Sequence, residues 1–232
     1  MFSMKKIALV CSTVISSLLL TAPATAGFYA ELSAGSAKNK AEANYTATYT
    51  TTYLGETQSE TETETDSSPS EKSTSFGVRF GYQFNNYIAV ELGHHQYGEW
   101  NENDVDEDGA NSSAKIESSS ISAGIKGILP LSDDLSLFAR AGLAKWDFKA
   151  TSTAGEFEPM KKDDNDIYYG IGAEYNVNES VSLGVEYSVL DMGWGESLSD
   201  AGTYEDFSYS TTGHYKTSYK VENISLLLKV SF

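Results

Sequence analysis

One segment of the sequence has carboxylates at the spacing of a calcium-binding loop. Asp104, Asp106 and Asp108 alternate along the chain and a glycine follows them. This matches the opening of the EF-hand loop, where oxygen ligands stand at positions 1, 3 and 5 and a glycine makes the sharp turn at position 6. The match then fails, because Lys115 stands at position 12, where a bidentate carboxylate is required. Two alternatives stay open: a Ca²⁺ site at the three aspartates, or a solvated acidic loop with loose divalent-ion bridging to lipopolysaccharide. The lysine at position 12 favours the second alternative.

The histidines give no catalytic arrangement. None of His94, His95 and His214 is followed two residues later by a serine, which is the spacing of base and nucleophile in outer-membrane lipid A deacylases. Cys11 is the one cysteine of the sequence and lies near its start, so the rest of the chain has no thiolate for a metal or a disulfide. We therefore expect no enzyme and, apart from the Ca²⁺ alternative, no cofactor.

A third set of charged residues lies between apolar positions of alternating segments. By parity these side chains share the inward face of the segments described below, and they comprise Glu31, Arg79, Glu91, Lys126, Arg140, Glu174, Glu186 and Lys229. Four are acids and four are bases, so we expect an ionic network, because an unpaired buried charge is costly. The preferred interpretation is a plug that holds the structure together. The alternative is a gated ion path or proton relay.

The elements that must position these residues are strands. Strict alternation over roughly ten residues, the length of a tilted membrane strand, recurs at about 27–37, 73–84, 87–100, 114–129, 135–150, 166–177, 181–192 and 217–232. The last segment ends on an aromatic residue, Phe232, which is typical of the closing strand of an outer-membrane barrel and predicts an insertion signal for the barrel-assembly machinery. The sequence therefore predicts an all-β fold, an eight-stranded antiparallel up-and-down transmembrane β-barrel.

The connections alternate between short turns and long polar segments. Turn residues occupy 85–86, 130–134 and 178–180, whereas 38–72, 101–113, 151–165 and 193–216 are long. This asymmetry predicts four long extracellular loops and both termini on the periplasmic side. The acidic, low-complexity run 56–71 predicts a mobile segment. The Thr/Tyr alternation at 46–52 leaves open whether strands continue beyond the membrane.

The first 26 residues are typical of a signal peptide. Lys5 and Lys6 precede a short apolar stretch, and Ala24-Thr-Ala26 is a small-residue cleavage site. We expect one barrel domain over residues 27–232. Without the two lysines it carries 14 basic and 33 acidic side chains, a net charge of −19. This excludes nucleic acid as a partner, because phosphates require a basic surface.

Three stretches of the alternating segments stand out together: 81–93, 123–143, and 172–177 with 185–187. In these stretches the chain resembles the transmembrane domain of the OmpA family. In that family an inward ionic cluster fills the lumen and can re-pair to gate a small pore; the matching positions are Glu91, Lys126, Arg140, Glu174 and Glu186.

Two departures qualify the resemblance. Gly184 stands where the family has an arginine, which weakens any gating prediction. The family's archetype also continues into a periplasmic peptidoglycan-binding domain, whereas this sequence ends at Phe232. We therefore expect a stand-alone barrel that does not tether the cell wall.

The aromatic residues near strand ends predict interfacial anchors; they are Trp100, Trp146, Trp194, Tyr82, Tyr87, Tyr97, Tyr169 and Tyr187. The expected location is the outer membrane of a Gram-negative bacterium, with lipids and lipopolysaccharide as partners. The expected function is surface interaction or envelope integrity through the acidic loops, with a host-surface or phage ligand. The alternative is a small gated pore for ions or small solutes.

Overall fold

The computed structural model describes residues 27–105, 111–152, 159–205 and 207–232. Nine strands occur in this part of the chain, and every neighbouring pair is antiparallel: β1 (Gly27–Tyr53), β2 (Glu56–Ser67), β3 (Glu71–Asn85), β4 (Ile88–Val105), β5 (Asn111–Pro130), β6 (Leu135–Ser152), β7 (Met160–Asn176), β8 (Val181–Tyr204) and β9 (Phe207–Ser231). The described residues contain no helix long and apolar enough to cross a bilayer.

Eight of the nine strands close into a barrel. β1 pairs with β3 along residues 27–39 and with β9 along residues 29–53, so β1 and β3 to β9 form a ring. β2 pairs only with the outer half of β1. Closure matters because an open sheet edge in lipid would leave backbone groups without hydrogen-bond partners. The eight-stranded antiparallel barrel predicted from the alternation is confirmed.

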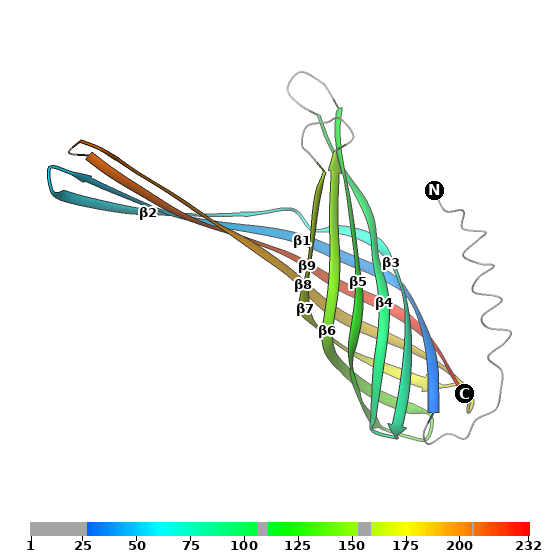
Figure 1. The fold of residues 1–232 in the computed structure, drawn as a ribbon. Coiled ribbons are helices and arrows are strands. Elements are labelled where there is room, and N and C mark those ends of the chain that lie inside the picture. The colour runs from blue at the N-terminus through cyan, green and yellow to red at the C-terminus, as the bar shows by residue number, and fades with distance from the viewer. Residues whose placement is uncertain (1–26, 106–110, 153–158, 206) are drawn as a thin grey trace.

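The outer surface of the barrel is a continuous apolar belt. Its members come from every strand of the ring, and five of them, Leu92, Ile121, Ile167, Ile224 and Leu226, are 64–69% exposed. Exposing such large apolar side chains to water would be unfavourable, whereas contact with lipid chains is favourable. The short turns lie at one end of the barrel (Figure 1), where the Phe232 amide also donates a hydrogen bond to the Phe28 carbonyl at 2.9 Å.

At the opposite end, the strands continue far beyond the predicted boundaries. β1 runs to Tyr53 instead of residue 37, β8 runs to Tyr204 instead of residue 192, and β9 begins at Phe207 instead of residue 217. Much of the predicted loops 38–72 and 193–216 is therefore strand. Residues 42–67 and 194–217 form a four-stranded sheet, β2–β1–β9–β8, which we call the arm; it projects to the side of the barrel in Figure 1.

The prediction of a mobile acidic run at 56–71 is wrong for residues 56–67. Threonine alternates with carboxylates in β2, so one side of the strand is β-branched, which favours an extended backbone. These hydroxyls also pair across to β1: the Oγ1 atoms of Thr48 and Thr61 are 3.0 Å apart, and those of Thr52 and Thr57 are 2.9 Å apart. Such cross-strand pairs stabilise a sheet, and the acidic side chains remain in solvent on the other side.

The barrel wall divides at its outer end. Pairing between β7 and β8 stops at Tyr168 and Leu190, and β3 begins only at Glu71, opposite Asn39 of β1. Beyond these points β4 to β7 continue along the barrel direction, whereas the arm turns aside (Figure 1). The molecule therefore has two outer extensions that rise from one closed ring.

Candidate functional site: a filled lumen and a projecting arm

The eight charged residues predicted to face inward form one layer inside the barrel. Each strand of the ring contributes one: Glu31 (β1), Arg79 (β3), Glu91 (β4), Lys126 (β5), Arg140 (β6), Glu174 (β7), Glu186 (β8) and Lys229 (β9). All eight are at most 7% exposed. We call this set the ionic layer.

Glu31 and Arg140 are at the centre of the ionic layer. The Arg140 guanidinium donates to both carboxylate oxygens of Glu31, at 2.8 and 2.9 Å, and its Nη1 lies 2.7 Å from Glu186 Oε2. Arg79 bridges the same two acids, with Nη1 2.8 Å from Glu31 and Nη2 2.8 Å from Glu186. Two arginines thus share two carboxylates, the fork geometry in which arginine is strongest.

The other pairs surround this centre. Glu174 accepts a 2.7 Å hydrogen bond from Lys126 Nζ and another from the ammonium of Lys229. Glu91 lies 3.3 Å from Arg140 Nε and accepts a 2.6 Å hydrogen bond from the hydroxyl of Tyr29. Every charge of the layer therefore has an opposite charge in contact, which offsets the desolvation of the set.

Aromatic rings complete this layer, and they were not among the residues predicted to face inward. The Phe138 ring lies between two cations, 4.5 Å from Lys126 Nζ and 4.6 Å from the Arg140 guanidinium carbon. The inward glycines make room for such rings: a Cβ at Gly172 would lie 2.3 Å from Phe138, and one at Gly81 would lie 2.2 Å from Tyr29. The same parity that marks Arg140 also marks Phe138 and could have found it.

An apolar cluster fills the lumen on the arm side of the ionic layer. Its eleven buried members are Ala37, Tyr97, Ala144, Trp146, Phe148, Ala150, Tyr168, Leu190, Met192, Tyr219 and Val221, with Ala41, Ile116 and Trp194 packed against them. We call it the apolar plug. The interfacial role predicted for Trp146 and Tyr97 is wrong, because both side chains are buried inside the barrel, where Trp146 Nε1 donates to Asp166 at 2.8 Å.

A small enclosed space separates the ionic layer from the apolar plug. Its volume is about 10 Å³, and Arg79, His95, Tyr97 and Tyr168 are among its walls. Two buried nitrogens here, His95 Nε2 and Arg79 Nε, have no protein hydrogen-bond partner. A space of this size holds about one water molecule, and its polar walls would suit one.

Two of the three predicted Ca²⁺ ligands fall outside the part of the chain that the structure describes. Asp106 and Asp108 lie outside the described residues, and the backbone of Asp104 pairs with Ser112 near the end of β4. Among the described residues there is no group of three or more histidine, cysteine or acidic side chains that could hold a metal ion. His214, outside any such group, pairs its Nδ1 with the Ser197 hydroxyl at 2.9 Å.

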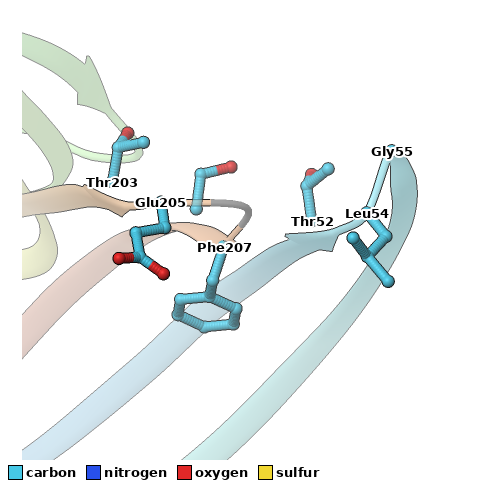
Figure 2. Close-up of a pocket in the computed structure, with 7 residues that line it drawn as sticks. Thr52, Leu54, Gly55, Thr203, Glu205 and Phe207 are labelled. Atoms are coloured by element: carbon cyan, nitrogen blue, oxygen red, sulfur yellow. The ribbon is translucent and has the colours of Figure 1, made fainter.

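The tip of the arm consists of two tight turns beside each other. Leu54 and Gly55 connect β1 to β2 with φ values of 48° and 86°, a two-residue turn of type I′. Glu205, in the turn between β8 and β9, has φ 49°. Figure 2 shows side chains from both turns at the tip. They line a hollow of about 360 Å³, and its lining residues are Thr52, Leu54, Gly55, Thr203, Glu205, Phe207 and Ser208.

The two faces of the arm differ in chemistry. One face is mostly hydroxyl: it carries the threonines and serines of β2 at positions 57, 59, 61, 63 and 65, opposite the threonines of β1. The other face continues the inward parity of β1. It combines acidic residues with exposed rings, among them Tyr49, Tyr53, Tyr204, Phe207, Tyr209 and Tyr215. We call it the aromatic–acidic face.

Comparison with known proteins agrees with this architecture. The sequence profile described as "Outer membrane protein beta-barrel domain" matches residues 7–232. A search of the curated proteins finds no match. Among solved structures, OprG from Pseudomonas aeruginosa is similar with a TM-score of 0.51 at 13% identity, covering 90% of this chain and 98% of OprG.

Two further barrels are similar at lower scores. Neisserial surface protein A (NspA) has a TM-score of 0.46 at 14% identity, covering 89% of this chain and 99% of NspA. Ail of Yersinia pestis, crystallised with the heparin analogue sucrose octasulfate, has a TM-score of 0.37 at 15% identity, covering 79% of this chain and 98% of Ail. The apolar belt and the family match together place this protein in a Gram-negative outer membrane.

Proposed function

We propose that this chain, which belongs to the outer membrane protein beta-barrel domain family, functions in surface interaction. The arm carries this function. The observation that supports it is the arm itself. Two segments far apart in the sequence, residues 42–67 and 194–217, pair through β1, β2, β8 and β9 into one sheet outside the barrel. Ordering so many residues costs conformational entropy, and the apolar belt gains nothing from it. A ligand-binding role would account for an ordered external sheet.

The filled lumen is a further argument for this function. The ionic layer pairs all eight of its charges and the apolar plug lies between it and the arm. An eight-stranded barrel is only wide enough for side chains. With the interior occupied, the protein serves as a rigid stalk that holds the arm at the cell surface, where it contacts a host surface, another cell or a phage.

Adhesion of cells that display an arm-less variant tests the proposal. Ala43 and Asp66 are cross-strand neighbours, and so are Gly195 and Lys216. Replacing residues 44–65 and 196–215 each by Asn-Gly therefore closes both hairpins with a favoured two-residue turn. At equal surface expression we expect the variant to lose adhesion to host cells or matrix. Adhesion equal to that of the full chain would overturn the proposal.

One observation favours a second candidate, a small gated pore. Lys126 Nζ lies 2.7 Å from Glu174 and also 3.8 Å from Glu31, so this lysine has a second carboxylate within reach for re-pairing. Planar-bilayer recording of the purified protein tests this function. A pore predicts a steady conductance that Lys126→Ala changes. The plug interpretation predicts a silent bilayer with both the original chain and the variant.

A further inference from the structure

The aromatic–acidic face carries an excess of negative charge. Seven carboxylates lie on it: Glu56, Glu60, Glu62, Glu64 and Asp66 from β2, and Glu196 and Asp200 from β8. Only Glu196 has a described cationic partner, Lys162 of β7 at 2.6 Å. The one lysine of the arm, Lys216, has the opposite parity and belongs to the hydroxyl face. Six carboxylates of this face therefore have no cationic partner among the described residues.

The rings between these carboxylates are held in place by their neighbours. Tyr209 lies across Gly202, where a Cβ would stand 2.5 Å from the ring, and its hydroxyl reaches Asp200 at 3.4 Å. Tyr45 packs over Gly213, with its Cε2 3.5 Å from where a Cβ would stand. Two glycines thus let the rings lie along the sheet. The result is an aromatic strip on β1 and β9, between an acidic row on β2 and a second acidic group on β8.

We propose that the aromatic–acidic face binds a cationic polypeptide segment, one in which arginine or lysine recurs at alternate positions. Acidic side chains on β2 recur every second residue, roughly 6.8 Å apart along the strand, the spacing of same-side residues in an extended peptide. The rings between the acidic rows offer cation–π contacts, in which arginine is the most frequent cation. Electrostatic complementarity would also speed association. This inference rests on the proposed surface-interaction function and names its partner.

The charge also argues against other occupants. A second copy of the arm would bring two acidic faces together, and like charges at such short range repel. Lipopolysaccharide is anionic and would be repelled in the same way. A neutral glycan could stack on the tyrosines, but it would leave six carboxylates without opposite charge. A cationic polypeptide is the partner that uses both the rings and the carboxylates.

The test measures binding of a labelled 16-residue peptide with arginine at alternate positions to the purified barrel in detergent micelles, by fluorescence anisotropy. The first variant is Glu60→Gln/Glu62→Gln/Glu64→Gln. Its charge-matched control is Asp133→Asn/Asp134→Asn/Glu179→Gln, which neutralises three exposed carboxylates on the turns at the far end of the barrel. A second control, Thr61→Gln/Thr63→Gln/Thr65→Gln, puts three glutamines on the hydroxyl face of the same strand. A further variant, Tyr49→Ser/Tyr209→Ser, removes two rings.

We expect the original chain to bind the peptide with an affinity that falls as salt rises. The glutamine variant of the acidic row and the ring variant should each weaken binding at least tenfold, and both controls should leave it within twofold. Equal weakening by the charge-matched control would overturn the proposal, because net charge alone would then explain binding. Binding of a neutral oligosaccharide, used as the comparison probe, without binding of the peptide would also overturn it.

Failure here is distinguishable from failure of the proposed function. If the arm-less cells lose adhesion but the arginine peptide does not bind, the arm is an adhesive surface for a different partner. If the arm-less cells adhere normally, the function itself fails, whatever the peptide does.

Discussion

At the scale of single residues, Leu54 has an unfavourable backbone conformation and an exposed apolar side chain. It is 68% exposed at the tip of the arm and has φ 48°, a left-handed conformation that costs a non-glycine residue roughly 1–2 kcal/mol. Asparagine tolerates this conformation much better and is preferred at this turn position. We predict that Leu54→Asn stabilises the outer hairpin of β1 and β2 by about 1 kcal/mol. Amide hydrogen exchange should show about fivefold greater protection of the arm's outer amides.

The matched control is Leu198→Asn. Leu198 is also exposed on the arm, at 65%, but it is not among the described residues with positive φ. Its replacement should give no added protection. Equal protection in both variants would mean that removing an exposed leucine, and not relieving the backbone, is responsible.

Arg140 is the residue on which most of the ionic layer depends, because it contacts Glu31, Glu91 and Glu186. Removing one partner of a buried ion pair leaves uncompensated charge and costs roughly 3–5 kcal/mol. We predict that Arg140→Ala lowers the free energy of unfolding by about that amount, measured by urea unfolding in lipid vesicles. Lys38→Ala is the control, since its 3.7 Å pair with Glu222 is half-exposed and should contribute less than about 1 kcal/mol.

At the scale of strands, alternation predicted the barrel well because lipid and a narrow lumen impose opposite demands on the two faces of each strand. Parity assigned the ionic layer to the face that the structure has buried, although its role stays a prediction. The same parity covers Trp146, which lies six residues from Arg140 and therefore on the same face of β6, but its position near a strand end suggested an interface instead. The signal was present and was outweighed by the usual place of tryptophan in membrane proteins.

The arm was harder to predict, for a physical reason. The composition of β2 is that of a disordered segment, and its alternating threonines favour an extended backbone but do not order it without a partner strand. Its order depends on β1, which is in turn held on its other side by β9, more than 150 residues away in the sequence. The local traces of this non-local pairing are the Thr/Tyr alternation at 46–52 and the alternating threonines of β2, and neither identifies the partner strand.

A side-chain ion pair connects β7 and β8 beyond the point where these strands separate. Lys162 of β7 donates to Glu196 of β8 at 2.6 Å, beyond the last paired residues of the two strands, and this lysine lowers the pKa of Glu196. A lowered carboxyl pKa means that the stabilising pair is complete above the usual glutamate value of about 4.3 and is lost as pH falls below it. We predict that spin labels on the outer parts of β7 and β8 report a broader distance distribution below about pH 4, and likewise at high salt.

Lys162→Gln supplies the control for this pH dependence. The variant should show the broad distribution at neutral pH and no further change on acidification. If the original chain and the variant broaden together at low pH, the Glu196 pair is not the cause. The pair is solvent-exposed, so the effect concerns the local spread of the strands and leaves the stability of the barrel aside.

At the scale of the whole molecule, the barrel and the arm are built to be separable. The strand pairs that close the ring lie outside the arm. β1 pairs with β3 over residues 27–39, β7 pairs with β8 within residues 168–190, and β8 pairs with residues 221–230 of β9. The buried members of the apolar plug also lie outside it, since Met192 and Tyr219 flank the arm without belonging to it. Only Trp194, packed on the plug, is an arm residue. The energetic centre of the fold therefore contains almost nothing of the proposed binding surface.

This arrangement predicts that the variant with residues 44–65 and 196–215 replaced by Asn-Gly unfolds at nearly the same temperature as the full chain, within a few degrees. Phe148→Ala should instead lower stability by roughly 3–5 kcal/mol, because it opens a cavity where Phe148 contacts Tyr219 and Trp194. Heat modifiability on gels and circular dichroism would measure both. A large fall in the arm-less variant would show that the arm supports the barrel, and its loss of adhesion could then reflect misfolding. A stable arm-less barrel that no longer adheres would assign recognition to the arm.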